Sequence, residues 1–355
     1  MPLTGVADRG AMSTTSDTAT SRPPTTREVR LAARPVGEPT PADFELAVTD
    51  LPPLAPGQLL VRNSWMSVEP YMRGRMDDAE SYIAPFELGG PLEGAAVGEV
   101  VESRADAVPV GATVVHFLGW RDHAVVDAES ATVVDPQLAP VQAYLDVLGT
   151  PGLTAWVALT EAAPVRPGDV VLVSSAAGAV GSVAGQLAGR LGAARVIGIA
   201  GGPHKVAGLA ELGYDAGIDH KAGPLAKQLA EAAPDGIDVY LDSVGGDHLE
   251  AAIDALRVGG RVALVGAVAE YNATAPVPGP TNLYEAVKKQ LTLRGVLVTS
   301  HLSRFPEYRA LVGPWLADGS FRRLETVVDG LDQAPRALID LLRGAAVGKM
   351  IVRVS

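Results

Sequence analysis

The most informative stretch of this chain is Asp169-Val170-Val171-Leu172-Val173-Ser174-Ser175-Ala176-Ala177-Gly178-Ala179-Val180-Gly181-Ser182-Val183-Ala184-Gly185. Its apolar beginning is typical of a buried β-strand, and the small residues that follow are typical of a tight turn. A helical pattern starts directly after the turn. A strand that ends in such a turn, at the N-terminus of a helix, is the arrangement that binds the pyrophosphate of a dinucleotide.

The turn departs from the GxGxxG fingerprint at its first position, which is Ala176. Gly178 is expected to let the backbone approach the phosphates, and Gly181 is expected to let the helix pack closely on the strand. The residues expected to face the sheet recur at helical spacing, and they are Val180, Val183, Leu187 and Leu191. Taken alone, the motif leaves open a glycine-rich turn that binds no ligand.

Strand and helix patterns alternate after the turn. Strands are predicted at Ala194–Ala200, Gly236–Asp242, Arg261–Ala267 and Leu291–Thr299. Helices are predicted around Lys205–Leu212, Ala222–Ala232 and Asp247–Leu256. This alternation predicts an α/β domain with a doubly wound, Rossmann-like parallel sheet.

The end of the second predicted strand bears on the cofactor. It runs into Gly201-Gly202-Pro203-His204-Lys205, with no acid to bind a ribose 2′-hydroxyl as NAD enzymes do. A lysine attracts a 2′-phosphate, so the sequence favours NADP(H), with Gly201 in the loop and Lys205 as the main phosphate contact. A solvated lysine on the first turn of a helix is the alternative. His220 and Lys221 are further candidates for contacts to the same phosphate.

Composition narrows the functional classes. The chain has 355 residues, 47% of them hydrophobic, a formal net charge of −12 and a sequence pI near 5.0. The acidic balance argues against nucleic acids and anionic membrane surfaces as partners. No membrane-length apolar run or secretory signal pattern is present, so we expect a cytoplasmic protein. The chain contains no cysteine, which excludes disulfides, thiolate zinc sites and a cysteine nucleophile.

The sequence predicts a two-domain organisation after a disordered N-terminal segment. Residues 1–26 are rich in Ser, Thr, Ala, Gly and Pro and are expected to be disordered. Short strands separated by Pro and Gly turns predict a β-rich, partly open barrel over residues 27–148. The Rossmann-like domain is expected over 149–318. The late strand Lys349–Val354 must pair with an earlier sheet, so 319–355 are assigned to the β-rich domain, and the dinucleotide domain is inserted within it.

Six segments resemble the zinc-independent branch of the medium-chain dehydrogenase/reductase superfamily, which includes leukotriene hydroxydehydrogenase/prostaglandin reductases, bacterial curcumin reductases and plant double-bond reductases. These segments are Val68-Glu69-Pro70-Tyr71-Met72-Arg73-Gly74-Arg75-Met76, Pro151-Gly152-Leu153-Thr154-Ala155-Trp156, Ala176-Ala177-Gly178-Ala179-Val180-Gly181-Ser182, Asp242-Ser243-Val244-Gly245-Gly246, Tyr271-Asn272 and Gly348-Lys349. The resemblance implies a GroES-like catalytic domain and a homodimer. It also implies NADPH-dependent reduction of a carbon–carbon double bond conjugated to a carbonyl, with hydride added to the β-carbon.

The resemblance also implies roles for individual residues. It places Tyr271 and Tyr71 at the substrate as catalytic residues, with Tyr82 and Tyr284 as weaker candidates for the substrate pocket. The residues implied to bind the cofactor are Thr154, Ala177, Gly178, Ala179, Val180, Gly181, Gly201, Lys205, His220, Ser243 and Val244. This chain has His220 where the family often has tyrosine, and Ala346 where many members have asparagine.

Two other functions remain open at this stage. Quinone reduction uses the same fold and cofactor, and the relative rates on an enone and on a simple quinone separate it from enone reduction. A cofactor-binding protein without turnover is the other alternative. It would bind NADPH yet consume none with any acceptor in a panel of enones, alkenals, quinones and diarylheptanoids.

Chelation tests the prediction that no metal is needed. The six histidines are scattered, without an HxxxH pair, and no thiolate is available. We therefore expect chelators to leave turnover unchanged and elemental analysis to find no stoichiometric zinc. A tightly bound metal whose removal abolishes turnover would contradict this prediction.

Overall fold

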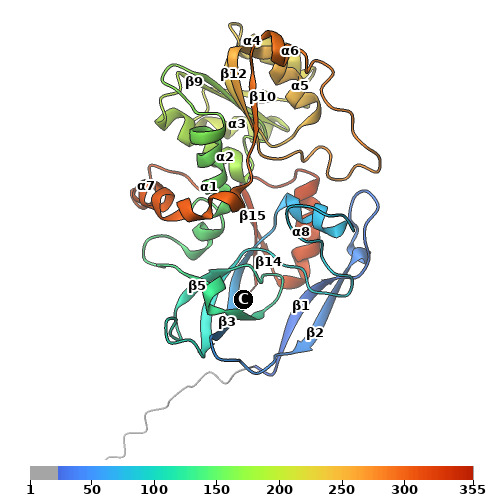
Figure 1. The fold of residues 1–355 in the computed structure, drawn as a ribbon, viewed down its shortest axis with the longest axis vertical. Coiled ribbons are helices and arrows are strands. Elements are labelled where there is room, and N and C mark those ends of the chain that lie inside the picture. The colour runs from blue at the N-terminus through green and yellow to red at the C-terminus, as the bar shows by residue number, and fades with distance from the viewer. Residues whose placement is uncertain (1–22, 355) are drawn as a thin grey trace, which may run out of the picture.

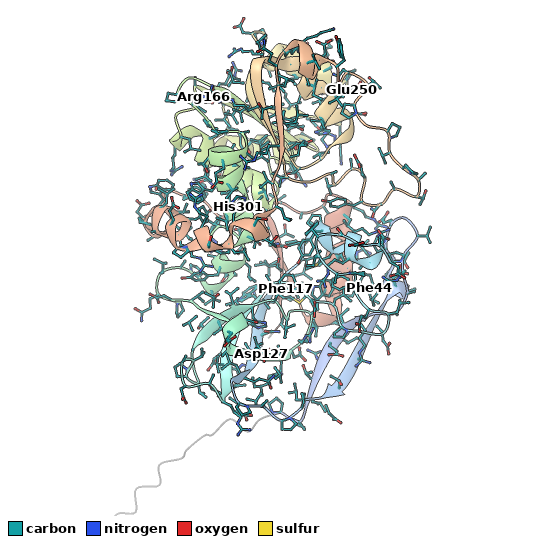
Figure 2. The ribbon with its side chains drawn as sticks, in the orientation of Figure 1. Phe44, Phe117, Asp127, Arg166, Glu250 and His301 are labelled. Atoms are coloured by element: carbon teal, nitrogen blue, oxygen red, sulfur yellow. The ribbon has the colours of Figure 1, made fainter. Side chains whose placement is uncertain are left out.

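The computed structural model of the protein describes residues 23–354. It is elongated, with one large sheet at each end (Figure 1). Arg166 and Glu250 lie with the upper sheet, and Phe117 and Asp127 lie with the lower one (Figure 2). Residues 1–22 of the segment predicted to be disordered, 1–26, lie outside the described residues. Thr25 and Thr26 belong to β1, so the prediction is wrong for these two residues, which pair with β2.

The upper sheet is parallel throughout and has six strands in the order β10-β9-β8-β11-β12-β13. The strands are β8 (Val170–Val173), β9 (Arg195–Ala200), β10 (Ala216–Asp219), β11 (Ile237–Asp242), β12 (Leu256–Leu264) and β13 (Thr292–Gly295). Numbered from β8, this order reads 3-2-1-4-5-6, which is the order of dinucleotide-binding folds. The predicted doubly wound sheet is therefore confirmed.

Helices cover the two faces of this sheet (Figure 1). They are α1 (Thr150–Val157), α2 (Ala179–Arg190), α3 (Pro203–Ala207), α4 (Leu225–Ala232), α5 (Gly246–Ala255), α6 (Glu285–Lys288) and α7 (Phe305–Ala317). Strand β8 is apolar at every position because both its faces are covered. Val171 and Val173 share a core with Val183 and Leu187 of α2, whereas Leu172 belongs to the core on the other face.

The lower sheet has seven strands: six follow the order β14-β15-β3-β4-β5-β7, and the seventh, β6, pairs with β3. The strands of this end are β1 (Thr25–Leu31), β2 (Phe44–Asp50), β3 (Gln58–Ser67), β4 (Ala96–Ser103), β5 (Thr113–His116), β6 (His123–Asp127), β7 (Thr132–Val133), β14 (Glu325–Asp329) and β15 (Lys349–Arg353). Strands β1 and β2 form a separate antiparallel pair. Helix α8 (Ala334–Leu342) packs on the core of this end with its apolar face.

Strands from the two ends of the chain meet in the lower sheet. Strand β15 pairs antiparallel with β3 and parallel with β14, as in Val352↔Met66 and Val328↔Val352. The prediction that the late strand pairs with the first sheet is thus confirmed. We propose that the boundaries near residues 148 and 318 separate the two domains, since the strands between them form a sheet of their own.

Several predicted elements differ in extent. The strand predicted at Leu291–Thr299 ends at Gly295, because Val298–Arg304 turns into a 3-10 helix. The helix predicted around Lys205–Leu212 is divided at Gly208 into α3 and a 3-10 turn (Leu209–Leu212). Strand β12 begins earlier than predicted, at Leu256. Across residues 23–354, the structure contains no helix with the length and apolar character needed to cross a bilayer.

Gly348 gives a test of how tightly β15 enters the sheet. Its φ is 70°, and a Cβ there would collide with the carbonyl oxygen of Leu324. Gly348→Ala should lower the free energy of unfolding by about 3 kcal/mol, because overpacking adds to the cost of left-handed backbone. Gly344→Ala is the matched control, since its φ is 73° and a Cβ there meets no described atom within 4 Å. It should cost only about 1 kcal/mol in urea denaturation, and equal losses would contradict this account.

Candidate functional site

A tight turn joins β8 to α2. Ser175 adopts a φ of 48°, and the Gly178 amide donates to the Ser175 carbonyl at 2.8 Å. Gly178 is the N-cap of α2, and among the described residues no side chain caps the first amides of this helix. Open amides at a helix N-terminus favour an anionic ligand, so the turn has the form expected for a phosphate contact.

The glycines of this turn are required by close packing. A Cβ on Gly181 would lie 2.7 Å from the Ala176 Cα, so α2 packs on the turn as the sequence predicted. A Cβ on Gly178 would lie 2.8 Å from the Ser175 Oγ. A larger residue at 178 would displace the Ser175 side chain, and the approach of the Gly178 backbone to phosphates stays a prediction.

The neighbouring strand β11 ends in a turn held by Asp242. One carboxylate oxygen accepts hydrogen bonds from the amides of Val244 at 2.9 Å and Gly245 at 3.0 Å. The same oxygen accepts from the Tyr240 hydroxyl at 2.8 Å and the Ser174 hydroxyl at 3.2 Å. Asp242 thus shapes the turn after β11 rather than doing acid–base work.

The turns after β8 and β11 flank the point where the strand order reverses. In such sheets, the crevice outside the carboxyl ends of the strands at this point binds the ligand. The Ser243 hydroxyl there is buried and has no hydrogen-bond partner within residues 23–354. Three features fit a bound dinucleotide: the unpaired Ser243 hydroxyl, the uncapped amides at the start of α2 and the close packing at Gly181.

Basic side chains gather where β9 ends. A Cβ on Gly201 would lie 2.8 Å from the His220 Nε2 and 3.1 Å from the Lys221 Cε. The acid in this region, Asp219, accepts hydrogen bonds from the amides of Gly202 at 2.8 Å and Lys221 at 2.9 Å. The Asp219 carboxylate thus stabilises this loop through its hydrogen bonds to the two amides. The end of β9 is where a dinucleotide presents its adenosine ribose, so these residues suit a 2′-phosphate.

Lys205 is tied to the C-terminal part of the chain. Its Nζ donates to the carbonyls of Gly344 and Ala346, each at 2.6 Å. Burial, followed by the charge of Lys221, lowers the pKa of Lys205. An ammonium has three donors, so one remains for a phosphate. The backbone carbonyl of Ala346 thus contacts this lysine directly.

His220 also contacts His248, which the sequence analysis did not single out. The two rings meet edge to face, with centroids 5.1 Å apart. Burial, and then Lys221, lowers the pKa of His220, and burial lowers the pKa of His248 to about 4. Both histidines line a cleft of about 510 Å³ beside α5. Glu250, which is labelled in Figure 2, lines the same cleft. The cleft adjoins the 2′-phosphate candidates.

Three of the predicted tyrosines lie near one another. Burial, followed by the neighbouring Tyr271, raises the pKa of Tyr82, and Tyr82 in turn contributes to the raised pKa of Tyr71. Tyr71 lies in the 3-10 turn Pro70–Met72, and Tyr271 lies in the long loop after β12. This loop reaches the β-rich domain, because a Cβ on Gly37 would lie 3.3 Å from the Thr274 side chain.

The hydroxyl of Tyr71 is buried without a partner. Its Oη has no hydrogen-bond partner in the part of the chain that the structure describes. Burial, and then the charge of Glu69, raises the pKa of Tyr71, so the phenol is protonated and can donate. The hydroxyl of Tyr271 lies 3.2 Å from a Cβ built on Gly266, just beyond β12, and burial raises its pKa too. Both tyrosines are therefore hydrogen-bond donors near neutral pH.

Arg73 and Arg75 are buried, with 2% and 6% of their surfaces exposed, and each is ion-paired. Arg73 pairs with Asp77 at 2.8 Å, and Arg75 pairs with Glu93 at 3.0 Å. The Arg75 guanidinium also lies 4.0 Å from the centre of the Phe86 ring. Both arginines hold the loops around Tyr71 and Tyr82.

Two predicted residues are placed differently from the others. The Thr154 hydroxyl donates to the Thr150 carbonyl at 2.7 Å inside α1, so its hydrogen is already used. Tyr284 is 69% exposed and precedes α6, at the end of the upper domain far from the β-rich domain (Figure 1). The structure does not bring Tyr284 to Tyr71, Tyr82 and Tyr271 among the described residues.

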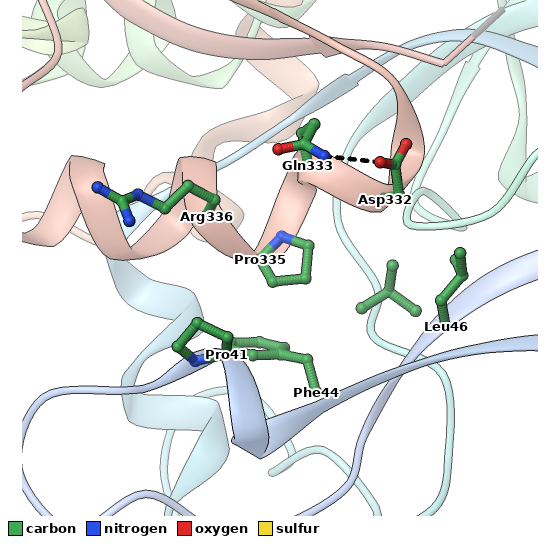
Figure 3. Close-up of a pocket in the computed structure, with 8 residues that line it drawn as sticks. Pro41, Phe44, Leu46, Asp332, Gln333, Pro335 and Arg336 are labelled. Atoms are coloured by element: carbon green, nitrogen blue, oxygen red, sulfur yellow. Dashed lines mark hydrogen bonds between the residues drawn. The ribbon is translucent and has the colours of Figure 1, made fainter.

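A separate hollow of about 300 Å³ lies between the β1–β2 pair and α8 (Figure 3). Pro41, Phe44 and Leu46 face Pro335 there, and Gln333 donates to Asp332 at 2.6 Å. Within the described chain, the residues predicted for the site do not line it. It therefore plays no part in the chemistry considered below.

A metal has no matching donor set in the structure. Residues 23–354 contain no group of three or more His, Cys, Asp or Glu side chains that could hold an ion. The full sequence contains no cysteine. No step is therefore derived through a metal, and the chelation experiment remains its test.

Two family models match the chain. The N-terminal domain of oxidoreductase matches residues 27–134, and zinc-binding dehydrogenase matches residues 179–314. The zinc in the second description has no thiolate to bind it here. The two matches cover most of the β-rich and dinucleotide-binding regions.

Similar proteins are reductases. NADPH-dependent curcumin reductase of Escherichia coli is 36% identical over 331 residues, which is 92% of this chain and 96% of that protein. Rat prostaglandin reductase 1 is 37% identical over 325 residues, covering 89% and 95%. The NADP(+)-dependent 2-alkenal reductase of tobacco is 33% identical over 336 residues, covering 93% and 97%.

Solved structures agree with these relatives. The crystal structure of CurA from Vibrio vulnificus in complex with NADPH is 38% identical, with a TM-score of 0.88 over 93% of this chain and 99% of that chain. A quinone oxidoreductase of Escherichia coli complexed with NADPH is 22% identical, with a TM-score of 0.74 over 92% and 99%, which shows a shared fold. The chain therefore belongs to the medium-chain dehydrogenase/reductase family, in the branch that contains the curcumin, prostaglandin and 2-alkenal reductases.

Proposed function

We propose that the protein reduces the carbon–carbon double bond of α,β-unsaturated ketones and aldehydes with NADPH. The observation that carries the proposal is the unpaired, buried Tyr71 hydroxyl, near Tyr82 and Tyr271, among the described residues of the region between the two domains. A carbonyl oxygen that gains charge during reduction needs such donors. The 2-alkenals named for the tobacco relative carry this conjugated group.

NADPH would be held by the residues around the strand-order reversal. The turn from Ala177 to Gly181, with Ala179 and Val180, supports the pyrophosphate, and Ser243 and Val244 form the opposite wall. Gly201, Lys205 and His220 would receive the 2′-phosphate, and Thr154 would contribute the packing of α1 near the nicotinamide. When bound, NADPH supplies the hydride.

The chain's own residues orient the substrate and stabilise charge. Hydride addition at the β-carbon moves negative charge to the carbonyl oxygen and gives an enolate. A hydroxyl hydrogen bond from Tyr271 or Tyr71 to this oxygen is stronger in the transition state than in the ground state, which accelerates the reaction. The α-carbon then takes a proton from solvent or a nearby acid.

Quinone reduction and binding without turnover are the alternatives. The sequence identities to the quinone oxidoreductases are 22–24%, so this similarity supports a shared fold and no shared activity. The deciding experiment is NADPH consumption with a panel of enones, alkenals, quinones and diarylheptanoids. Preference for simple quinones, or tight NADPH binding without consumption, would contradict enone reduction.

Lys205→Ala tests the phosphate assignment. The wild type should prefer NADPH over NADH by at least about tenfold in kcat/KM, which corresponds to about 1.4 kcal/mol. The substitution should raise the KM for NADPH and change NADH kinetics far less, because only NADPH carries the phosphate. Lys227→Ala, an exposed lysine of α4, is the control. Equal losses with both cofactors would instead reflect the broken bonds to Gly344 and Ala346.

Tyr271→Phe tests the donor to the enolate oxygen. Hydride transfer should slow by about tenfold to a hundredfold, about 1–3 kcal/mol for one lost donor. NADPH affinity should hardly change, because the ring remains. Single-turnover NADPH oxidation with an enone, alongside cofactor binding by fluorescence, gives both values. Tyr144→Phe removes a hydroxyl that is bonded to the Asp135 carbonyl and serves as the control. An unchanged rate in Tyr271→Phe would leave that residue a packing role.

We also propose a homodimer that uses the free edge of the upper sheet. Strand β13 ends the strand order, and an exposed edge strand is normally covered. Large apolar side chains are exposed nearby, namely Val258, Leu283 and Val287. Light scattering at micromolar concentration should give twice the chain mass, and a monomeric mass would contradict the proposal.

A further inference from the structure

Lys349 is a fully buried lysine at the start of β15. Only 2% of its side chain is exposed. Its Nζ donates to the Val68 carbonyl at 3.2 Å and to the Glu69 Oε1 at 2.9 Å. A buried ammonium is tolerated only when it is paired and hydrogen-bonded, so these contacts fix the side chain in one place.

The partners of Lys349 belong to the turn that carries Tyr71. Glu69 also accepts a hydrogen bond from the Ser67 hydroxyl at 2.8 Å, and the Val68 amide donates to the Met350 carbonyl at 3.2 Å. Glu69 is extended, with φ −138° and ψ 145°, as expected before a proline. The short turn Pro70–Met72 follows directly. Both polar backbone groups of Val68 and the carboxylate of Glu69 are thus held, in large part by β15.

The preceding residue contacts the other wall of the site. The Gly348 amide donates to the Ala177 carbonyl at 2.7 Å, in the turn between β8 and α2. Gly348 and Lys349, two successive residues at the entry to β15, therefore join the dinucleotide turn to the tyrosine turn. The distance between the turn that contains Ala177 and the turn that carries Tyr71 therefore depends on the contacts of Gly348 and Lys349.

Other charges surround the lysine. Asp146 is buried, and burial raises its pKa to about 7, against the lowering effect of Arg323 and then Lys349. Arg323 pairs with Glu325 at the start of β14. The Glu69 carboxylate lies close enough to Tyr71 to raise the pKa of its hydroxyl. Lys349 is thus the cation paired with Glu69 beneath the Tyr71 turn, and its charge also acts on Asp146.

We propose that Lys349 is a positioning residue that, through Glu69 and the Val68 carbonyl, fixes the Tyr71 hydroxyl at the substrate carbonyl. The inference deepens the proposed enone reduction and rests on it. Loss of the ammonium leaves the largely buried Glu69 carboxylate with the Ser67 hydroxyl but without its ion pair, so Glu69 moves toward solvent and displaces the turn that follows it. A displacement of a donor by about 1 Å can lower the rate by as much as about a hundredfold.

The test compares Lys349→Met, Lys349→Arg and Glu69→Gln with the wild type. Methionine keeps the length of the side chain, arginine keeps the charge, and glutamine keeps the shape of Glu69. The kinetic readouts are kcat with an enone and the KM values for enone and NADPH. The structural readout is ¹⁹F NMR of protein labelled with 3-fluorotyrosine, in which Tyr71→Phe identifies the Tyr71 resonance among the 8 tyrosines.

We expect Lys349→Met to lower kcat by about tenfold or more, to leave the KM for NADPH within about twofold, and to shift or broaden the Tyr71 resonance. The exposed Tyr284 resonance should stay in place. Glu69→Gln should act in the same direction, and Lys349→Arg should recover part of the loss. If Lys349→Met does not fold, the double variant with Glu69→Gln removes both charges and gives the same readouts.

Arg261→Met is the matched control. Arg261, within β12, and Asp169, just before β8, form a buried pair at 2.8 Å in the upper sheet, to which Tyr71, Tyr82 and Tyr271 do not belong. Its loss should reduce stability but leave kcat and the Tyr71 resonance unchanged. A wild-type kcat and an unmoved Tyr71 resonance in Lys349→Met would overturn the inference. Equal changes in Arg261→Met would also overturn it. If the wild type reduces no enone, the proposed function fails, and the resonance alone decides the position of Tyr71.

Discussion

The pairing of β15 between β14 and β3 is the constraint on which the rest of the molecule depends. It brings the last strand of the chain into the sheet that the first part of the chain begins, so the dinucleotide domain is held at both of its ends. The entry of β15 is so crowded that glycine is required at 348. From there, consecutive residues reach the turn after β8 and the turn that carries Tyr71. The pairing of β15 in the lower sheet therefore also sets the positions of the two turns that form the candidate site.

Local patterns predicted most of the fold. The apolar run Val170–Val173 and the small residues after it define β8 and the start of α2, because burial on both faces requires such a sequence. The pairing of the late strand followed from its apolar sequence and its place near the end of the chain, because a single late strand must join an earlier sheet. Element ends were less predictable. Strand β13 stops at Gly295 because the next residues form a 3-10 helix, and no short-range pattern separates the two.

The positions of two turns of the candidate site were predictable from local motifs, whereas their role in cofactor binding stays a prediction. The turns around Gly178 and Ser243 stand where their motifs placed them, on the two strands that flank the reversal. The bonds of Lys205 to Gly344 and Ala346 could not be predicted, because they join positions 139 and 141 residues apart. Lys349 and Glu69 are 280 residues apart. A lysine in an apolar strand signals a buried charge, but only the folded chain identifies its partner.

The unpaired Tyr71 hydroxyl has a consequence for selectivity. Within residues 23–354 it lacks a hydrogen-bond partner, and a buried polar group left in that state costs about 1–3 kcal/mol. A ligand with an oxygen at this point removes the cost, whereas a hydrocarbon of the same shape keeps it. Sites built in this way reject analogues that lack the polar atom more strongly than an apolar pocket rejects a change of size. The protein would therefore discriminate against isolated alkenes at the binding step, because such a ligand leaves the Tyr71 hydroxyl without a hydrogen-bond partner.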